Sequence, residues 1–226
     1  MIIWIVLIIA AYLLGSVPVS YLAARSRGID LRRQGTKQVG GGNLWRTTSR
    51  KLGLAAGLFD FAKGMAMVWL AQTQGLGVDQ QVIVGLGAIV GHNWPLFLNF
   101  HGGRGIATLL GIVMILPAIN MMSPWPAVIA IGIVAVGTLI LRSSPFPVFV
   151  GVTSLPVTNG IFYRDATIAL GFVAIFLIVV LKRLTAQPSA EAASISKTNL
   201  FLNRLLFDRD IRDRHVWVYR KPKKEV

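Results

Sequence analysis

The sequence contains no cysteine, and of its 226 residues only three are histidine and nine are acidic. Without cysteine, disulfide bonds and thiolate metal sites are excluded. The histidines and acids are scattered along the chain, and they do not have the spacing that is typical of metal ligands. We therefore expect a protein without a metal site.

Charge is also scarce, since 14% of the residues are charged, whereas 54% are hydrophobic and the mean hydropathy is +0.63. A soluble domain of this length carries more charge, so the composition indicates an integral membrane protein. The 23 Lys and Arg residues give a formal net charge of +14. In a membrane protein this excess is typical of cytoplasmic loops that face anionic lipid headgroups, and we expect membrane lipids rather than nucleic acid as its partner.

Windows of about 20 residues, the length that spans a hydrocarbon core of about 30 Å, identify seven apolar segments. They are residues 2–24, 53–72, 81–98, 106–122, 125–141, 145–162 and 165–182. Pro95 is expected to end or kink the third segment, and the sixth is the least secure because it contains three prolines. The predicted fold class is an all-α, polytopic membrane helical bundle with about seven transmembrane helices, although five spans also fit if the weakest pair is left out.

The basic residues predict the orientation. Eight of them lie in residues 25–51 and eleven in residues 182–224. With seven spans and the N-terminus outside, both groups lie on the cytoplasmic side, and only Arg164 falls outside. We expect a transmembrane domain over residues 1–183 and a basic cytoplasmic tail over residues 184–226, which begins with a flexible linker and continues as an amphipathic segment.

Two glycine-rich loops are expected on the cytoplasmic face. The second contains "HGGRGIATLLG", residues 101–111, in which a helix is expected to begin directly after Gly105. Glycine lets the backbone approach a ligand, a helix N-terminus favours an anion, and Arg104 offers a planar fork for phosphate oxygens. We interpret this loop as a phosphate cradle; the alternative is tight helix packing beside an arginine of the positive face.

The first loop contains "GTKQVGGGN", residues 35–43, which combines the Thr36 hydroxyl, the Asn43 amide and three consecutive glycines, with Arg46 one turn further on. The order of residues in a Walker A loop is missing, so nucleotide hydrolysis gains no support. Two phosphate-binding loops on one face indicate two anionic substrates or one large phosphorylated lipid.

Three polar residues are expected beside these loops. Asp60 and Lys63 are three residues apart on one face of the second apolar segment, where they form a structural ion pair that supports the loops. A functional role is the alternative, because charges inside a membrane are costly. His92 precedes the break at Pro95 and acts as a structural hydrogen-bonding group, a base or a phosphate ligand.

Together these motifs are similar to those of a known family. "LFDFAKG" contains an Asp-x-x-Lys-Gly signature, and "GHNWPLFLNFHGGRGIATLLG" matches a second signature with Arg104 in place of the usual lysine. Over residues 12–111 the sequence resembles the bacterial membrane acyl-phosphate:glycerol-3-phosphate acyltransferases. The resemblance implies an enzyme of phospholipid biosynthesis in a bacterial cell membrane, with its active site on the cytoplasmic face. It would join the fatty acyl group of an acyl phosphate to glycerol 3-phosphate, giving 1-acylglycerol 3-phosphate (lysophosphatidic acid) and phosphate.

The resemblance also implies roles for individual residues. Thr36, Asn43 and Arg46 would lie beside the reacting phosphate, and a substrate phosphate or His92 would take the hydroxyl proton. The residues expected to bind glycerol 3-phosphate or phosphate are Gly40, Gly102, Gly103, Arg104, Gly105 and Thr108.

Besides Arg104, the sequence departs from the family pattern in further places. Lys37 stands where the family has glycine, and Gln38 where it has asparagine. The family's third motif is not recognisable. The stretch "NLFLNRLL" is at most weakly similar to that motif, and it lies at a shifted position. These departures keep open a catalytically silent or repurposed member that binds phospholipid precursors. A small anion transporter is a further alternative, although the polar residues crowd one face instead of the bilayer midplane.

Overall fold

The computed structural model describes residues 2–220, and every regular element within this range is a helix. This confirms the predicted all-α fold class. The elements in chain order are α1 (Ile2–Ser16), α2 (Val19–Arg25), α3 (Gly41–Thr47), α4 (Arg50–Thr73), α5 (Val78–Asn93), the 3-10 turn η1 (Leu96–Leu98), α6 (Ile106–Ile119), α7 (Trp125–Leu141), α8 (Pro145–Phe162), α9 (Ala166–Leu184), the 3-10 turn η2 (Ala190–Ser194), α10 (Lys197–Phe207) and α11 (Arg214–Val218).

Five helical segments are long and apolar enough to cross a membrane. They are Ile2–Arg25, Arg50–Thr73, Val78–Leu98, Pro145–Phe162 and Ala166–Leu184. Helices α6 and α7 are apolar but shorter, with 14 and 17 residues. The sixth segment, expected to be the least secure, is among these five, and so is the third, in which Pro95 is expected to cause a break. The number of spans stays a prediction.

Prolines explain this difference. Pro145 and Pro147 lie in the first turn of α8, where a helix needs no N–H donor, and only Pro156 lies inside the helix. As expected, α5 ends just before Pro95, and the chain continues after this proline as a 3-10 turn. Elsewhere, polar side chains mark helix starts: the Ser49 hydroxyl accepts from the Leu52 N–H, and the Asp165 carboxylate accepts from the Ile168 N–H.

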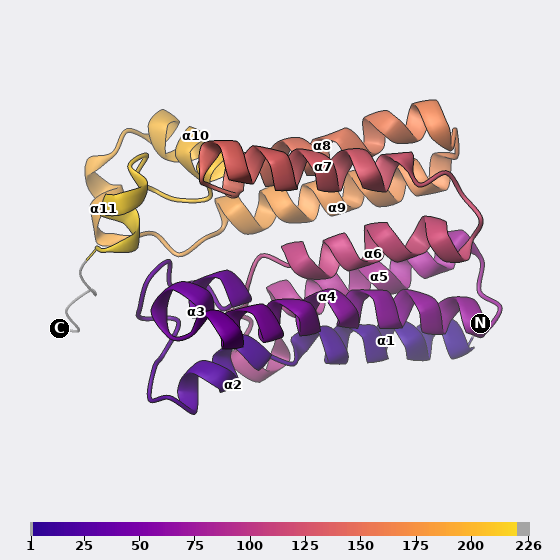
Figure 1. Cartoon of the computed structure of the whole chain (residues 1–226), viewed down its shortest axis with the longest axis horizontal. Coiled ribbons are helices and arrows are strands. Elements are labelled where there is room, and N and C mark those ends of the chain that lie inside the picture. Colours follow the sequence, from indigo (N-terminus) through magenta and orange to yellow (C-terminus); the bar gives the residue numbers. More distant parts are fainter. Residues whose placement is uncertain (1, 221–226) are drawn as a thin grey trace.

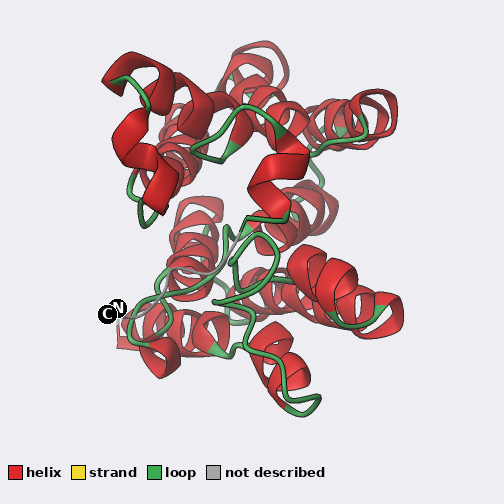
Figure 2. Cartoon of the chain, turned by 90° about the vertical axis from the view of Figure 1, so that its left-hand side faces the viewer, coloured by secondary structure: helices red, strands yellow, loops and turns green. Residues whose placement is uncertain are grey.

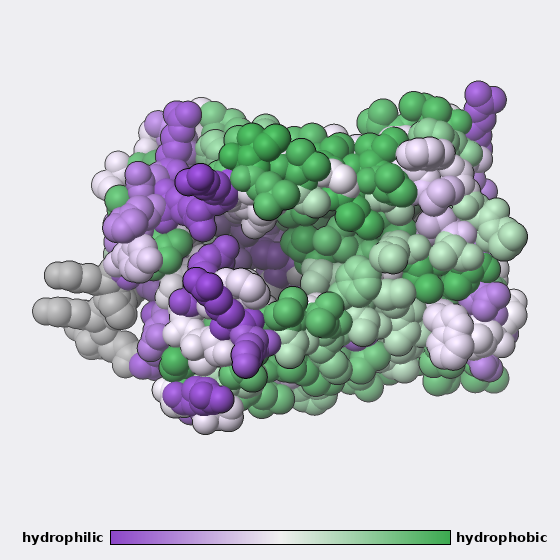
Figure 3. Space-filling view, in the orientation of Figure 1, coloured by the Kyte–Doolittle hydropathy of each residue, from purple (hydrophilic) through white to green (hydrophobic). Residues whose placement is uncertain are grey.

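The long helices run side by side in two groups (Figure 1). One group contains α1, α4, α5 and α6, in which α1 packs on α5 and α4 on α6; the other contains α7, α8 and α9. A buried apolar core joins the groups through Ile89, Leu109, Leu155 and Ile175. On the face shown in Figure 3, hydrophobic side chains cover the middle of the bundle, as expected of helices that face lipid.

The polar elements gather at one end of the bundle, opposite the N-terminus. Helices α2, α3, α10 and α11 lie there (Figure 1), and the surface around them is hydrophilic (Figure 3). Viewed from this end, loops cross the middle of the molecule between the helices (Figure 2). The basic loop and the tail thus share one end, as the charge pattern predicts. Residues 221–226 of the predicted tail lie outside the described residues.

Candidate active site

Both glycine-rich loops line one open cavity of about 1420 Å³ at the polar end of the bundle. Arg46 of α3 and Arg104 of the second loop both lie on its wall. A hollow is visible there between hydrophilic and hydrophobic surface (Figure 3). Of the residues singled out in the sequence, those that line this cavity are Gly40, Asn43, Arg46, Asp60, His92, Gly103, Arg104 and Gly105.

Four predicted residues lie elsewhere. Thr36 lines a smaller adjoining cavity of about 150 Å³, which also reaches Arg46 and Arg104. Gly102 and Lys63 lie behind the main cavity, against the end of α5 and against α1. Thr108 is fully buried where α6 crosses Gly64 of α4, so its backbone is part of a helix contact and does not face the cavity.

The cavity has an apolar wall as well as a polar one. Leu54, Leu58 and Phe61 follow one another along a face of α4, and Ile106 and Leu110 of α6 complete the apolar wall. Such a wall suits the hydrocarbon chain of an amphiphile. The arrangement therefore fits a molecule with a charged head and a long apolar tail.

Asn43 shapes the first loop. Its side chain is buried, and its Nδ2 donates to the carbonyls of Leu31, Gln34 and Gln38 at 3.0–3.1 Å, while its Oδ1 accepts from the Thr36 N–H at 3.0 Å. All of the amide's donors are used within the loop, and none is left for a ligand. In this structure Asn43 holds the loop in shape and is not free to contact a substrate.

The backbone conformation at position 37 is one that glycine favours. Lys37 has φ = 61°, in the left-handed region that glycine adopts without strain. Gly35 also has a positive φ, and a Cβ atom there would lie 2.3 Å from Oδ1 of Asn43. The loop thus keeps its turn with lysine at position 37, although a side chain at position 35 would displace the Asn43 amide.

Arg46 is available to bind an anion. Its guanidinium donates to the carbonyl of Gly42 at 3.0 Å, and within residues 2–220 no carboxylate pairs with it. Burial and the nearby positive charge of Arg214 lower the pKa of Arg46. Arg214 lines the same cavity from α11. Two cations close together on the wall of one cavity favour a bound anion.

The second loop packs tightly against the first loop and against α5. A Cβ atom on Gly103 would lie 2.3 Å from Nε2 of His92 and 2.5 Å from the carbonyl oxygen of Val39. Gly105, with φ = 69°, is the N-cap of α6. The free N–H groups of the first turn of α6 therefore begin at the cavity, where they favour negative charge.

Asp60 and Lys63 form the expected ion pair, with 2.8 Å between Oδ1 and Nζ. Both side chains are almost inaccessible, and the Lys63 Nζ also donates to the carbonyl of Gly15 at 2.9 Å and lies 3.0 Å from Nδ1 of His92. The ion pair thus connects α4 with α1 and with the imidazole ring that faces Gly103.

Sequence reasoning missed the contribution of the tail. Asp208, at the end of α10, accepts from Nε of Arg104 at 2.9 Å, and its other carboxylate oxygen lies 2.8 Å from Nη2 of Arg104. Nη1 of Arg104 donates to the carbonyl of Lys182 at 2.8 Å. No motif in the sequence indicates that Asp208 contacts the second loop. The one hint is an acidic side chain within a basic tail. Within residues 2–220, no three acids or histidines gather as metal ligands would.

Comparison with known proteins identifies the family. The family model described as glycerol-3-phosphate acyltransferase matches residues 5–187. The chain is 44% identical over 225 residues to glycerol-3-phosphate acyltransferase 5 of Dehalococcoides mccartyi, covering 96% of this chain and 94% of that one. It is 40% identical over 139 residues to the glycerol-3-phosphate acyltransferase of Desulforudis audaxviator, covering 59% of this chain and 70% of that one.

Two solved structures are also similar. They are crystal structures of PlsY, an integral membrane glycerol 3-phosphate acyltransferase, in a glycerol 3-phosphate form and a lysophosphatidic acid form. The first has a TM-score of 0.72 and 27% identity over 80% of this chain and 88% of PlsY. The second has a TM-score of 0.69 and 25% identity over 80% of this chain and 87% of PlsY. The chain therefore belongs to the glycerol-3-phosphate acyltransferase family and is an integral membrane acyltransferase.

Proposed function

We propose that this protein transfers a fatty acyl group from an acyl phosphate to glycerol 3-phosphate at the cytoplasmic face of a bacterial plasma membrane. The products are 1-acylglycerol 3-phosphate and inorganic phosphate. The observation that carries the proposal is the single cavity in which Arg46 and Arg104, from two different loops, lie beside an apolar wall. The glycerol 3-phosphate and lysophosphatidic acid forms of PlsY support this choice of acceptor and product.

The two phosphorylated substrates have different places in this proposal. The phosphate of glycerol 3-phosphate lies at Arg104 and at the N-terminus of α6, where Gly103 and Gly105 add no side chain to the cavity. The phosphate of the acyl donor lies at Gly40 and Arg46. Its acyl chain extends along the apolar wall of α4 and α6, so that the carbonyl carbon lies between the two phosphates.

The chemistry needs no cofactor, because an acyl phosphate is already activated. The acceptor hydroxyl oxygen attacks the carbonyl carbon, and the bond from that carbon to the phosphate oxygen breaks, so phosphate leaves with the electron pair. The hydroxyl proton passes to a phosphate oxygen. The protein contributes by orienting the hydroxyl and by stabilising the negative charge that develops on the carbonyl oxygen and on the leaving phosphate.

His92 acts as a hydrogen-bond donor in this mechanism. The Lys63 ammonium has three N–H donors and no lone pair, and its three partners are Oδ1 of Asp60, the Gly15 carbonyl and, at 3.0 Å, Nδ1 of His92. The Asp60 carboxylate lies farther from Nδ1, at 3.3 Å. Nδ1 therefore accepts from Lys63, which places the single proton of a neutral imidazole on Nε2. Since Nε2 faces Gly103, His92 donates to a substrate oxygen there and leaves the hydroxyl proton to a substrate phosphate.

An acceptor-dependence assay tests the proposal. Purified protein in detergent is expected to release phosphate from palmitoyl phosphate only when glycerol 3-phosphate is present, and to form 1-palmitoylglycerol 3-phosphate in equal amount by mass spectrometry. Arg46→Ala is expected to lower this release on the order of 10²-fold, because a preorganised charge beside the leaving phosphate is lost. Arg27→Ala, which removes an exposed arginine outside the cavity, is the matched control.

Equal phosphate release with and without the acceptor would contradict acyl transfer. Binding of glycerol 3-phosphate without turnover would instead identify a silent member of the family that binds phospholipid precursors.

A further inference from the structure

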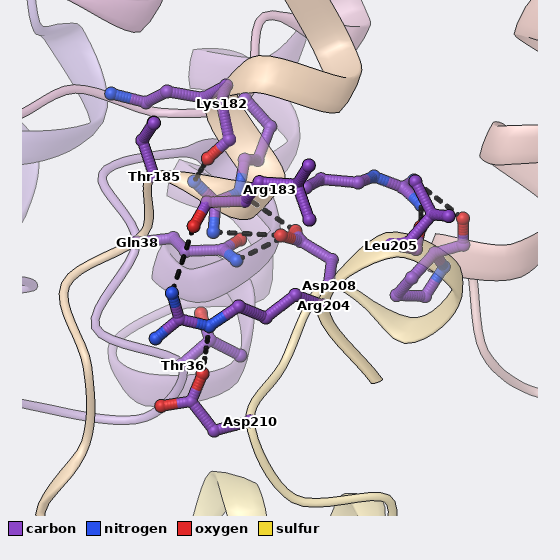
Figure 4. Close-up of polar contacts among 12 residues, drawn as sticks. Thr36, Gln38, Lys182, Arg183, Thr185, Arg204, Leu205, Asp208 and Asp210 are labelled. Atoms are coloured by element: carbon purple, nitrogen blue, oxygen red, sulfur yellow. Dashed lines mark hydrogen bonds and ion pairs between the residues drawn. The ribbon is translucent and has the colours of Figure 1, made fainter. Parts of the chain in front are cut away.

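Asp208 of the tail contacts both glycine-rich loops. Its Oδ2 accepts from Nε of Arg104 in the second loop at 2.9 Å and from Nε2 of Gln38 in the first loop at 2.9 Å. Its Oδ1 lies 2.8 Å from Nη2 of Arg104. Figure 4 shows the Asp208 carboxylate beside the Gln38 amide. One carboxylate thus joins two loops that are distant in the sequence and that line the same cavity.

The tail holds Asp208 rigidly. Asp208 ends α10 in the left-handed conformation, with φ = 53°. Directly beside it, Arg204 donates to Asp210 at 2.7 Å and to the carbonyl of Leu184 at 2.9 Å, while Arg183 of α9 donates to the carbonyl of Leu205 at 2.6 Å (Figure 4). These contacts fasten both ends of the turn to the end of α9, so the carboxylate has a fixed position.

The geometry leaves Arg104 able to bind a ligand. A guanidinium has five N–H donors. In Arg104, Nε donates to Oδ2 of Asp208 and Nη1 donates to the carbonyl of Lys182, while Nη2 lies 2.8 Å from Oδ1 of Asp208 in an ion pair. The donors that remain can therefore serve a phosphate. Lys182 and Arg183 also lie close to Asp208, so the surroundings keep an excess of positive charge.

We infer that Asp208 is a positioning residue of the phosphate site, which aims the Arg104 guanidinium at the phosphate of the acceptor and ties the first loop to the second through Gln38. Gln38 and Arg104 are two positions at which the sequence departs from the family pattern, and their longer side chains meet at this carboxylate. The inference rests on the proposed function for the identity of the ligand. It also makes residues of the predicted tail part of the active site.

The test is the affinity for glycerol 3-phosphate, measured by isothermal titration calorimetry on the full chain in detergent, together with the KM and kcat of acyl transfer. Asp208→Asn is expected to raise the Kd and the KM for glycerol 3-phosphate about 10- to 100-fold, because the guanidinium loses its fixed orientation. The kcat is expected to change much less than the Kd, because Arg104 is proposed to contact the phosphate of the acceptor and not the reacting carbonyl group. Asp213→Asn is the matched control: it removes the same charge from the tail, and asparagine still caps α11.

A second pair of variants separates positioning from a loss of structure. Lysine at position 104 cannot form the two-pronged contact, so Asp208→Asn in an Arg104→Lys protein is expected to add less than about a twofold further change, the scatter of the measurement. Equal effects of Asp208→Asn in both proteins would overturn the inference. So would an unchanged or lower Kd in the Asp208→Asn protein, the lower value meaning that the carboxylate competes with phosphate.

The calorimetry keeps the two proposals distinguishable. A Kd that rises as expected in a protein without turnover would support the role of Asp208 and contradict the proposed function. Normal turnover with an unchanged Kd and KM in the Asp208→Asn protein would support the proposed function and contradict the role of Asp208.

Discussion

Gly103→Ala is expected to lower kcat/KM for acyl transfer by on the order of 10²-fold or more, because displacements of about 1 Å at a reacting centre have effects of this size. The added Cβ atom would lie 2.3 Å from Nε2 of His92 and 2.5 Å from the carbonyl oxygen of Val39. Neither neighbour is the end of a flexible side chain, since one is a ring held by Lys63 and the other is backbone. The second loop must therefore move away from both His92 and the first loop.

The measurement is kcat/KM for glycerol 3-phosphate, with thermal unfolding in detergent as a check of the fold. Gly160→Ala in α8 is the control, because nothing lies within 4 Å of a Cβ atom there. Gly160→Ala is expected to have wild-type activity. Wild-type kcat/KM in the Gly103→Ala protein would show that close contact between the second loop and His92 is not needed for the reaction.

Lys63→Met is expected to destabilise the protein by about 3–5 kcal/mol, the usual effect of removing one partner from a buried ion pair. The carboxylate of Asp60 is only 5% exposed and would lose its nearest cation. Activity is expected to fall as well, because the ammonium no longer holds Nδ1 of His92 as an acceptor. Thermal unfolding and kcat measure the two effects separately.

The double variant Asp60→Asn/Lys63→Met separates the two roles of the ion pair. Both buried charges are gone, so most of the lost stability is expected to return. The amide introduced at position 60 can accept from Nδ1–H of His92 or donate to Nδ1, so the ring proton is no longer held on Nε2 by an ammonium that can only donate. Turnover is therefore expected to stay low. Recovery of wild-type kcat in the double variant would contradict the need for the Lys63 ammonium to hold the ring proton of His92 on Nε2.

The features of the site that depend on local pattern and on topology can be predicted from the sequence. Glycine-rich loops on one side of the bilayer, each with an arginine, are expected to bind phosphate, and the structure brings Arg46 and Arg104 to one cavity. The spacing of Asp60 and Lys63 on one helix face likewise predicts their contact. These features follow from helix periodicity and from charge, which are both local properties of the sequence.

Other features depend on tertiary packing. An asparagine in a glycine-rich loop suits a ligand and a turn equally well, and only the fold shows that the Asn43 amide is used by its own loop. From the sequence alone, three prolines indicate a weak sixth span. In the structure two of them lie in the first turn of α8, where they do not interrupt the helix. Asp208 lies 104 residues after Arg104, and its role depends on how the tail folds back.

The central claim is that both phosphorylated substrates occupy one cavity at the same time. Initial rates of acyl transfer, measured while the concentrations of acyl phosphate and glycerol 3-phosphate are both varied, test it most directly. Direct transfer between two bound substrates predicts double-reciprocal lines that intersect, with no burst of phosphate when glycerol 3-phosphate is left out. Parallel lines, together with such a burst, would reveal a covalent acyl-enzyme and would contradict the account.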